Sequence, residues 1–226
     1  MFYTLLRLLR RLGFDTDLLT SVEEIQSSGL FDEEWYVRDF GPLRRILTHP
    51  VMHYVRRGAR TGRNPNPLFD SRFYAARLST KQDQQNPLLH YLRIGTAQGR
   101  DPCWWFDSDW YVQSYDVGLQ DGSSPLLDYL KVGLDEGRAT HPLFDRSWYL
   151  SRYGGATHHT DPIVDYIYAG AQEGRVPHRA LADTDFTSQH HGGVTRVLHA
   201  AAAVKDPRAP RNISRETFDH EASDRL

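Results

Sequence analysis

One pattern occurs four times along this chain at an almost constant interval. The dipeptide Phe-Asp begins at residues 31, 69, 106 and 144, so successive copies are 38, 37 and 38 residues apart. Each copy continues with an aromatic pair, a proline, a polar residue followed by Tyr, a central Gly and a closing Gly-Arg. A fixed period of this length is typical of proteins built from stacked supersecondary units. The sequence therefore predicts a tandem array of about four repeats.

Each repeat begins with the signals for a short helix. The Asp of Phe-Asp has the features of an N-cap, whose side chain accepts hydrogen bonds from the first helical turn. Phe precedes this Asp and Tyr follows it four positions into the helix, a pair that can form a hydrophobic staple. The pairs are Phe31 with Tyr36, Phe69 with Tyr74, Phe106 with Tyr111 and Phe144 with Tyr149. The Trp or Phe that precedes each Tyr is also expected to enter the core.

A second short helix is predicted from the proline in each repeat. Proline suits the first helical position, because its missing N–H needs no partner there. A polar N-cap precedes it in Asn86-Pro87, Ser124-Pro125 and Asp161-Pro162, whereas His49-Pro50 is a weaker version. The residues that follow place apolar side chains at helical spacing. The central Gly is expected to take the left-handed conformation that ends a helix.

These signals predict an all-α fold of about four helical hairpins of 37–38 residues, with no sheet in residues 30–178. Such short helices gain most of their stability from tertiary packing. Of the 27 Phe, Trp and Tyr residues, 22 lie within the repeats, so aromatic side chains are expected to form the core. The pattern leaves open whether the array is solenoid-like or compact.

The two ends lie outside the repeat pattern. Residues 1–29 are expected to form amphipathic helices. Within them, Met1–Phe14 carries three Arg and no acidic residue, which suits a helix that caps the array or one that lies on an anionic membrane surface. Residues 179–226 contain few aromatic residues, so we expect a mostly disordered tail or the start of an incomplete transferase domain.

Charge and cysteine content limit the possible functions. The net charge is −2, so no strong overall field would attract nucleic acid. The single Cys103 excludes an internal disulfide and fits a reducing compartment. The chain also lacks an apolar run of about 18 residues, the length that a membrane-spanning helix needs. We expect a cytoplasmic protein, or one held peripherally at an inner membrane.

No catalytic residue, metal ligand or cofactor site is predicted. The polar residue before the second Tyr is His53, His90, Asp128 or Asp165. Equivalent positions of stacked hairpins are about 8–10 Å apart, so these four should not converge on a metal. His158-His159 and His190-His191 lack the spacing of a defined metal motif, and no neighbouring base is evident for Cys103.

The closing arginines have two interpretations. They could form a ladder that binds an anionic glycan or phosphate, since guanidinium suits such oxygens. Alternatively, each could bond carbonyls or a capping Asp at the joint between repeats. The residues are Arg63, Arg100, Arg138 and Arg175. Exposed Trp or Tyr could likewise stack on sugar rings, although their positions favour the core.

The repeat pattern, F-D-x-x-W-Y followed by P-L-L-H-Y-L-x-x-G-x-x-E-G-R, resembles a helical repeat attached to bacterial glycosyltransferases and rhamnan-synthesis-type polysaccharide proteins. Residues 86–100 and 124–138 match it best, and residues 161–175 follow closely, whereas the segment between the helices departs from it. The resemblance implies that sugar transfer belongs to separate α/β domains. Residues His191, Gly192 and Gly193 are similar to the Gly-Gly segment that opens the first helix of a two-domain glycosyltransferase.

Three functions follow from these observations. The resemblance implies a non-catalytic scaffold for a glycosyltransferase or another glycan-assembly protein in surface polysaccharide biosynthesis. A second interpretation is a truncated or divergent glycosyltransferase that binds its donor through the tail. A third is a carbohydrate-binding module that uses aromatic side chains and the arginine ladder.

Overall fold

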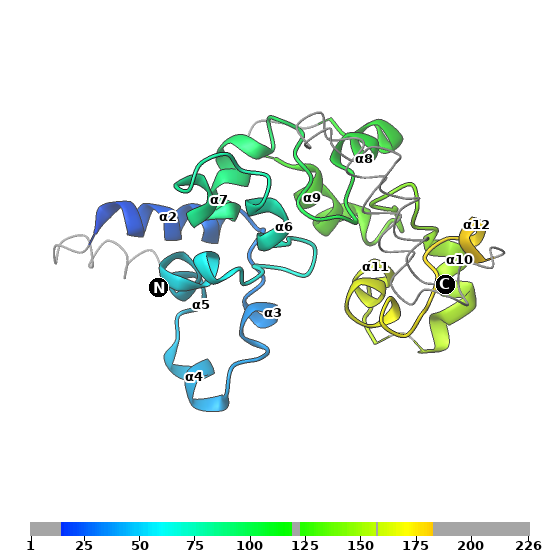
Figure 1. Ribbon diagram of the computed structural model, residues 1–226, viewed down its shortest axis with the longest axis horizontal. Helices are drawn as coiled ribbons and strands as arrows, with labels where there is room; N and C mark the ends of the chain where they lie inside the picture. The colour runs from blue at the N-terminus through cyan, green and yellow to red at the C-terminus, as the bar shows by residue number, and fades with distance from the viewer. Residues whose placement is uncertain (1–14, 119–122, 157, 183–226) are drawn as a thin grey trace, which may run out of the picture. The chain divides into compact units, whose positions relative to one another are not determined.

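The computed structural model describes residues 15–118, 123–156 and 158–182 (Figure 1). These residues contain helices and turns but no strand, which confirms the all-α prediction for the described part of the chain. The chain separates into two compact units, Met1–Leu181 and Ala182–Leu226, and the first holds all four repeats. The segments predicted at the two ends, Met1–Phe14 and residues 183–226, lie outside the described residues.

The structure contains a first and a second helix in each repeat, and the repeats comprise residues 31–68, 69–105, 106–143 and 144–178. The first helices are α3 (Glu33–Val37), α6 (Ser71–Ala75), α8 (Ser108–Tyr115) and α10 (Arg146–Tyr153). The second helices start as α5 (Pro50–His53), α7 (Pro87–His90), α9 (Pro125–Asp128) and α11 (Pro162–Asp165). Each continues as a π-helical turn: η1 (Tyr54–Gly58), η4 (Tyr91–Gly95), η5 (Tyr129–Gly133) and η7 (Tyr166–Gly170).

Shorter elements connect and flank these hairpins. Helix α2 (Thr16–Ser27) precedes repeat 1, and α4 (Pro42–Leu47) lies in the loop between α3 and α5. The 3-10 turns are η2 (Ala59–Thr61), η3 (Asp83–Gln85) and η6 (Gly154–Ala156), and α12 (Arg179–Ala182) follows repeat 4.

The first helices begin as the sequence predicts. In each repeat the capping Asp accepts a hydrogen bond from the backbone N–H three residues later, at 2.9–3.0 Å. The stapled Phe and Tyr rings lie 4.9–5.3 Å apart between centroids. Each stapled Tyr is at most 1 % exposed, whereas Trp35, Trp110 and Trp148 remain half-buried. Consecutive positions point about 100° apart around a helix, so Tyr fills the core and the preceding Trp lies at its edge.

The central glycines do not take the predicted left-handed conformation. Positive φ angles of 61–74° occur instead at the second glycines, Gly62, Gly99, Gly137 and Gly174. The N–H of the following Arg bonds the carbonyl of the central Gly at 2.8–2.9 Å, which is a Schellman ending. The second helix therefore ends later than predicted. The central position needs glycine for a different reason: a Cβ on Gly95 would overlap the Tyr74 hydroxyl, and the same holds in every repeat.

Hydrogen bonds between successive linkers join each repeat to the next segment. The backbone N–H of each capping Asp donates to a backbone carbonyl at 2.9–3.0 Å. In repeats 1 to 3 this carbonyl lies just before the next Phe-Asp, and in repeat 4 it lies after the last turn of the repeat. The acceptors are Pro65, Pro102, Thr140 and Pro177. This fixed bond accounts for the narrow range of repeat lengths.

Repeat 4 also contacts repeat 1. The Tyr168 ring meets Trp35 edge-on at 4.7 Å between centroids, and the Tyr168 hydroxyl donates to the Pro67 carbonyl at 3.1 Å. The four hairpins are thus connected by neighbouring linkers and by contacts between the first and the last.

Gly95→Ala tests the role of the central glycine. We expect the free energy of unfolding to fall by about 1–3 kcal/mol, because the new Cβ must displace the buried Tyr74 hydroxyl. Gly155→Ala is the control, since a Cβ there meets no atom within 4 Å. Urea denaturation measures both changes. Adding Tyr74→Phe to Gly95→Ala should restore part of the loss, and equal stability of the two alanine variants would contradict this explanation.

Candidate functional site

A repeated polar pair lies inside every hairpin. The buried Tyr of the first helix contacts the polar residue at the end of the α-helical part of the second helix. The pairs are Tyr36 with His53 at 2.8 Å, Tyr74 with His90 at 3.0 Å, Tyr111 with Asp128 at 2.7 Å and Tyr149 with Asp165 at 2.7 Å. These side chains therefore bind within their own repeats, where His53, His90 and Asp128 stay partly exposed and Asp165 is buried.

The closing arginine side chains also bond within the hairpins that hold these polar pairs. Arg63 donates to the Tyr36 carbonyl at 2.6 Å, and Arg100 donates to the Arg77 carbonyl at 3.3 Å. Arg63 also pairs with Asp39 at 3.6 Å, outside the Tyr36–His53 pair. In repeats 3 and 4 the arginine pairs with the carboxylate that contacts the buried Tyr. Arg138 binds Asp128 and Arg175 binds Asp165, both at 2.8 Å, and the side chain of Arg175 is only 9 % exposed. These contacts fit the structural interpretation of the arginines, while binding of an external anion stays a prediction.

The charge of the polar residue that contacts the buried Tyr changes along the array. Burial and nearby arginines lower the pKa of His53. Burial also lowers the pKa of His90, where Arg100 adds to the effect and Asp83 opposes it. Both shifts favour neutral imidazoles. Burial alone would raise the pKa of Asp165, but the His158 N–H, the Tyr149 hydroxyl and Arg175 together hold it below its usual value. Repeats 1 and 2 thus contain a neutral polar pair where repeat 4 contains a buried ion pair.

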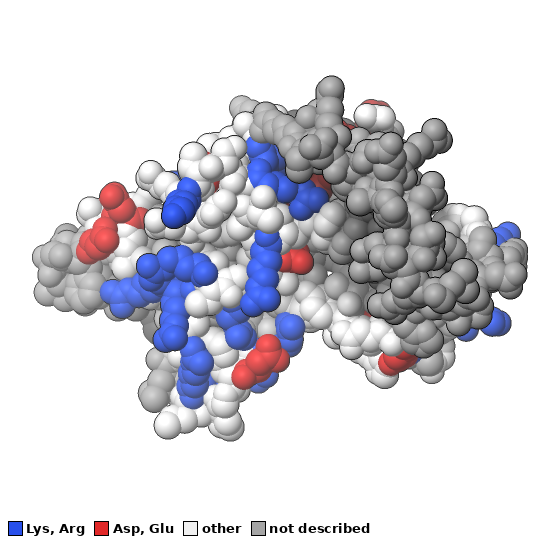
Figure 2. All heavy atoms as spheres, in the orientation of Figure 1, with Lys and Arg blue, Asp and Glu red and all other residues white. Residues whose placement is uncertain are grey.

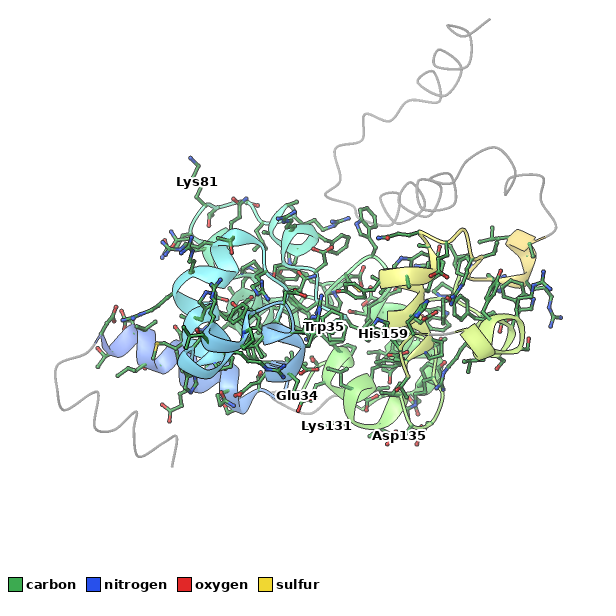
Figure 3. The ribbon with its side chains drawn as sticks, turned by 90° about the horizontal axis from the view of Figure 1, so that it is seen from below. Glu34, Trp35, Lys81, Lys131, Asp135 and His159 are labelled. Carbon is green, nitrogen blue, oxygen red and sulfur yellow. The ribbon has the colours of Figure 1, made fainter. Side chains whose placement is uncertain are left out.

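A cavity of about 370 Å³ lies among repeats 1, 3 and 4. Its wall is mostly apolar, and Trp35 and His159 lie beside each other at its edge (Figure 3), with ring centroids 6.2 Å apart. The principal side chains around it are Trp35, Leu68, Leu130, Leu134, His159 and Thr160. An apolar wall with a few polar groups is typical of a small-molecule site.

Contacts inside the protein hold the walls of this cavity in place. The Arg38 guanidinium stacks over the Trp35 ring, 3.2 Å from its centroid. In repeat 4, Asp161 accepts bonds from the Tyr129 hydroxyl at 3.0 and 3.1 Å, and burial raises its pKa. The Asp161 carboxylate and the Asn66 amide are therefore already partnered. The polar side chains that remain in the lining are those of Asp32, His159 and the exposed Thr160.

The described residues contain no group of three or more His, Cys, Asp or Glu side chains placed to hold a metal. Cys103 is buried, and burial raises the pKa of its thiol, so a reactive thiolate is disfavoured. Within the same residues, no helix has the length and hydropathy to cross a membrane. His191, Gly192 and Gly193 lie outside the described part of the chain.

The fold and these internal networks define an all-α tandem-repeat protein. No family model matches the chain, and searches of curated proteins and of solved structures also give no match.

The sequence pattern did not indicate the cavity, because its walls come from three repeats, two of which are not adjacent in the sequence. One signal was nevertheless present. Tyr168 stands where the other repeats have Arg56, Arg93 and Lys131. This single aromatic departure is the residue that contacts Trp35.

Asp165→Asn tests the buried ion pair. We expect the free energy of unfolding to fall by about 3 kcal/mol at neutral pH, because Arg175 loses its buried partner. The folded-state pKa of Asp165 lies below the unfolded value of about 3.9, so its contribution is complete above that pH and is lost as pH falls through the folded-state pKa. Urea denaturation over a pH series should show the two proteins converging in strong acid, whereas the exposed control Asp135→Asn should change little. A difference independent of pH would contradict the assignment.

His90→Asp gives repeat 2 the carboxylate that repeat 3 has at the equivalent position, Asp128. Because the pKa of His90 is lowered in the folded state, its contribution is complete above the unfolded value of about 6.5 and declines as pH falls through the folded-state pKa. The new Asp can pair with Arg100, so its own loss should begin only below about pH 3.9. The variant should therefore lose less stability than wild type in mild acid, as measured by urea denaturation. The control Gln82→Asp adds a carboxylate at an exposed position of the same repeat and should leave the slope unchanged.

Proposed function

We propose that this chain is a non-catalytic helical-repeat module that serves a glycosyltransferase or another glycan-assembly protein in bacterial surface polysaccharide biosynthesis. The observation that carries the non-catalytic part is the internal use of the repeated polar side chains. Tyr, His or Asp, and Arg recur in every unit, yet they bond one another or the backbone inside their own hairpin. Their recurrence is therefore explained by folding and requires no shared reaction.

The polysaccharide part of the proposal rests on the resemblance of the repeat pattern. Residues 86–100 and 124–138 carry that pattern most completely, and both segments form the second helix and its Schellman ending. Repeat arrays offer extended surfaces that bind partners without chemistry of their own. Fold alone does not determine function, so the proposal depends on a direct test with donors and partners.

A direct test uses the purified chain, nucleotide-sugars and a glycosyltransferase partner. Calorimetry should show no binding of nucleotide-sugars, and sugar transfer to an acceptor should be absent. Chemical cross-linking in cells should attach the chain to a glycosyltransferase or another glycan-assembly protein, identified by mass spectrometry. Donor binding that protects the segment around His191 from proteolysis would instead support the truncated transferase. Cross-links only to proteins of unrelated function would contradict the scaffold.

The cavity beside Trp35 favours a second function, recognition of a glycan. A sugar ring has apolar C–H faces and hydroxyl edges, which match an apolar wall with His159 and Thr160 at its rim. In this case the module would hold the growing polymer rather than the enzyme.

Blocking the cavity separates these two functions. We expect Thr160→Trp to fill its rim and to weaken binding of polysaccharide fragments by about tenfold or more, measured by calorimetry. Ser79→Trp adds the same side chain at an exposed position of repeat 2 and should leave affinity unchanged. Equal affinities of both variants would place glycan binding elsewhere, and an absence of fragment binding by wild type would remove the second function.

A further inference from the structure

Charge is unevenly distributed between the two halves of the array. Residues 31–105 contain 12 basic and 7 acidic residues, a net charge of +5, whereas residues 106–178 contain 5 basic and 11 acidic residues, a net charge of −6. The near-zero charge of the whole chain hides this separation. Repeats 1 and 2 therefore offer a positive field to an anionic partner at short range.

The basic side chains of repeats 1 and 2 gather on one face. Figure 2 shows Lys and Arg grouped over α5, η1 and the segment leading to α4. Six exposed residues, which we call the basic surface, have no ion pair with a carboxylate within the described residues. They are Arg45, Arg56, Arg57, Arg60, Arg72 and Lys81. The last three line one shallow basin of about 610 Å³.

Comparison among repeats shows that part of this charge is not required by the fold. Arg57 and Arg60 correspond to Val132 and Asp135 in repeat 3, where the same helix and the same Schellman ending form. Arg56 corresponds to Lys131, so a positive charge recurs at that position. The charges of Arg57 and Arg60 are therefore free to serve recognition.

An exposed apolar side chain accompanies the basic surface. Leu43, in α4, is 72 % exposed, more than any other exposed large apolar residue in the described part of the chain. Figure 1 shows α4 at the tip of the loop between α3 and α5. Arg44 attaches this loop to the hairpin, because its guanidinium bonds His53 at 2.8 Å and lies over the Phe40 ring. The loop thus presents Leu43 outward from a fixed base.

We infer that repeat 1 docks on an anionic membrane surface, with Leu43 inserted among the lipids and the basic surface against their headgroups. An apolar tip flanked by Lys and Arg matches the boundary between headgroups and acyl chains. Each cation near an anionic bilayer adds attraction that depends on salt. A soluble polyanion or the acidic half of a second copy would use the charges but would have no need of Leu43. This inference is separate from the proposed function, and either can fail alone.

Vesicle sedimentation with the full chain tests the inference. Wild type should bind vesicles made of equal parts phosphatidylcholine and phosphatidylglycerol, and it should bind pure phosphatidylcholine far less. Added salt should weaken binding, because screening shortens the range of the headgroup charge. No binding to the anionic vesicles, or equal binding to both kinds, would overturn the inference.

Variants test whether repeat 1 carries the vesicle binding. The triple variant Arg45→Gln, Arg56→Gln, Arg57→Gln should weaken vesicle binding on the order of a hundredfold, and Leu43→Ser should weaken it about tenfold. The matched control Lys131→Gln, Val132→Ser changes equivalent positions in repeat 3 and should retain wild-type affinity. Unchanged circular dichroism and melting verify that every variant folds.

Three results would assign binding to another source. Both repeat 1 variants could keep wild-type affinity for vesicles, while a variant with Arg7, Arg10 and Arg11 changed to Gln loses it. This result would assign membrane binding to Met1–Phe14. Salt-sensitive self-association without vesicle binding would identify a second copy as the partner. Tighter binding of a soluble acidic polysaccharide, unaffected by Leu43→Ser, would identify a polymer. Each of these results would overturn docking through repeat 1.

Discussion

The burial of the stapled tyrosine in each repeat is the constraint on which the rest of the structure depends. Its ring packs against the stapled Phe, and its hydroxyl must reach a polar partner inside the hairpin because a buried, unpaired hydroxyl is costly. The approach is so close that only glycine fits opposite it, as Gly95 does for Tyr74. Three features of the repeat pattern, the aromatic pair, the polar residue and the central glycine, are therefore parts of one contact.

The same contact explains why the repeats differ in their electrostatics without differing in fold. A hydroxyl can donate to a neutral imidazole or to a carboxylate, so His90 and Asp165 are both acceptable partners. A carboxylate also allows the closing arginine to turn inward, as Arg175 does, whereas Arg100 bonds a backbone carbonyl. Surface positions such as Arg60 and Asp135 lie outside this network and carry opposite charges.

Local signals predicted the local structure, and their limits are physical. The capping Asp, the staple and the proline act within one helical turn, so the sequence located each helix start. The helix end was misplaced because the choice between Gly95 and Gly99 depends on Tyr74, a contact from another helix. The Trp35 cavity was not predicted at all, since it requires the spatial relation of three repeats. Only Tyr168, which stands where the other repeats have Arg or Lys, indicated this cavity.

The contact between Tyr168 and Trp35 has a consequence for cooperativity. In a linear repeat array, stability is a sum of units and nearest-neighbour interfaces, so a terminal unit can fray alone. Here the last hairpin cannot detach without releasing the first, because their rings and the Tyr168–Pro67 hydrogen bond link them. The two ends therefore open together, and a ligand bound in the cavity between them would stabilise the whole closed array rather than one edge, because it binds the closed form.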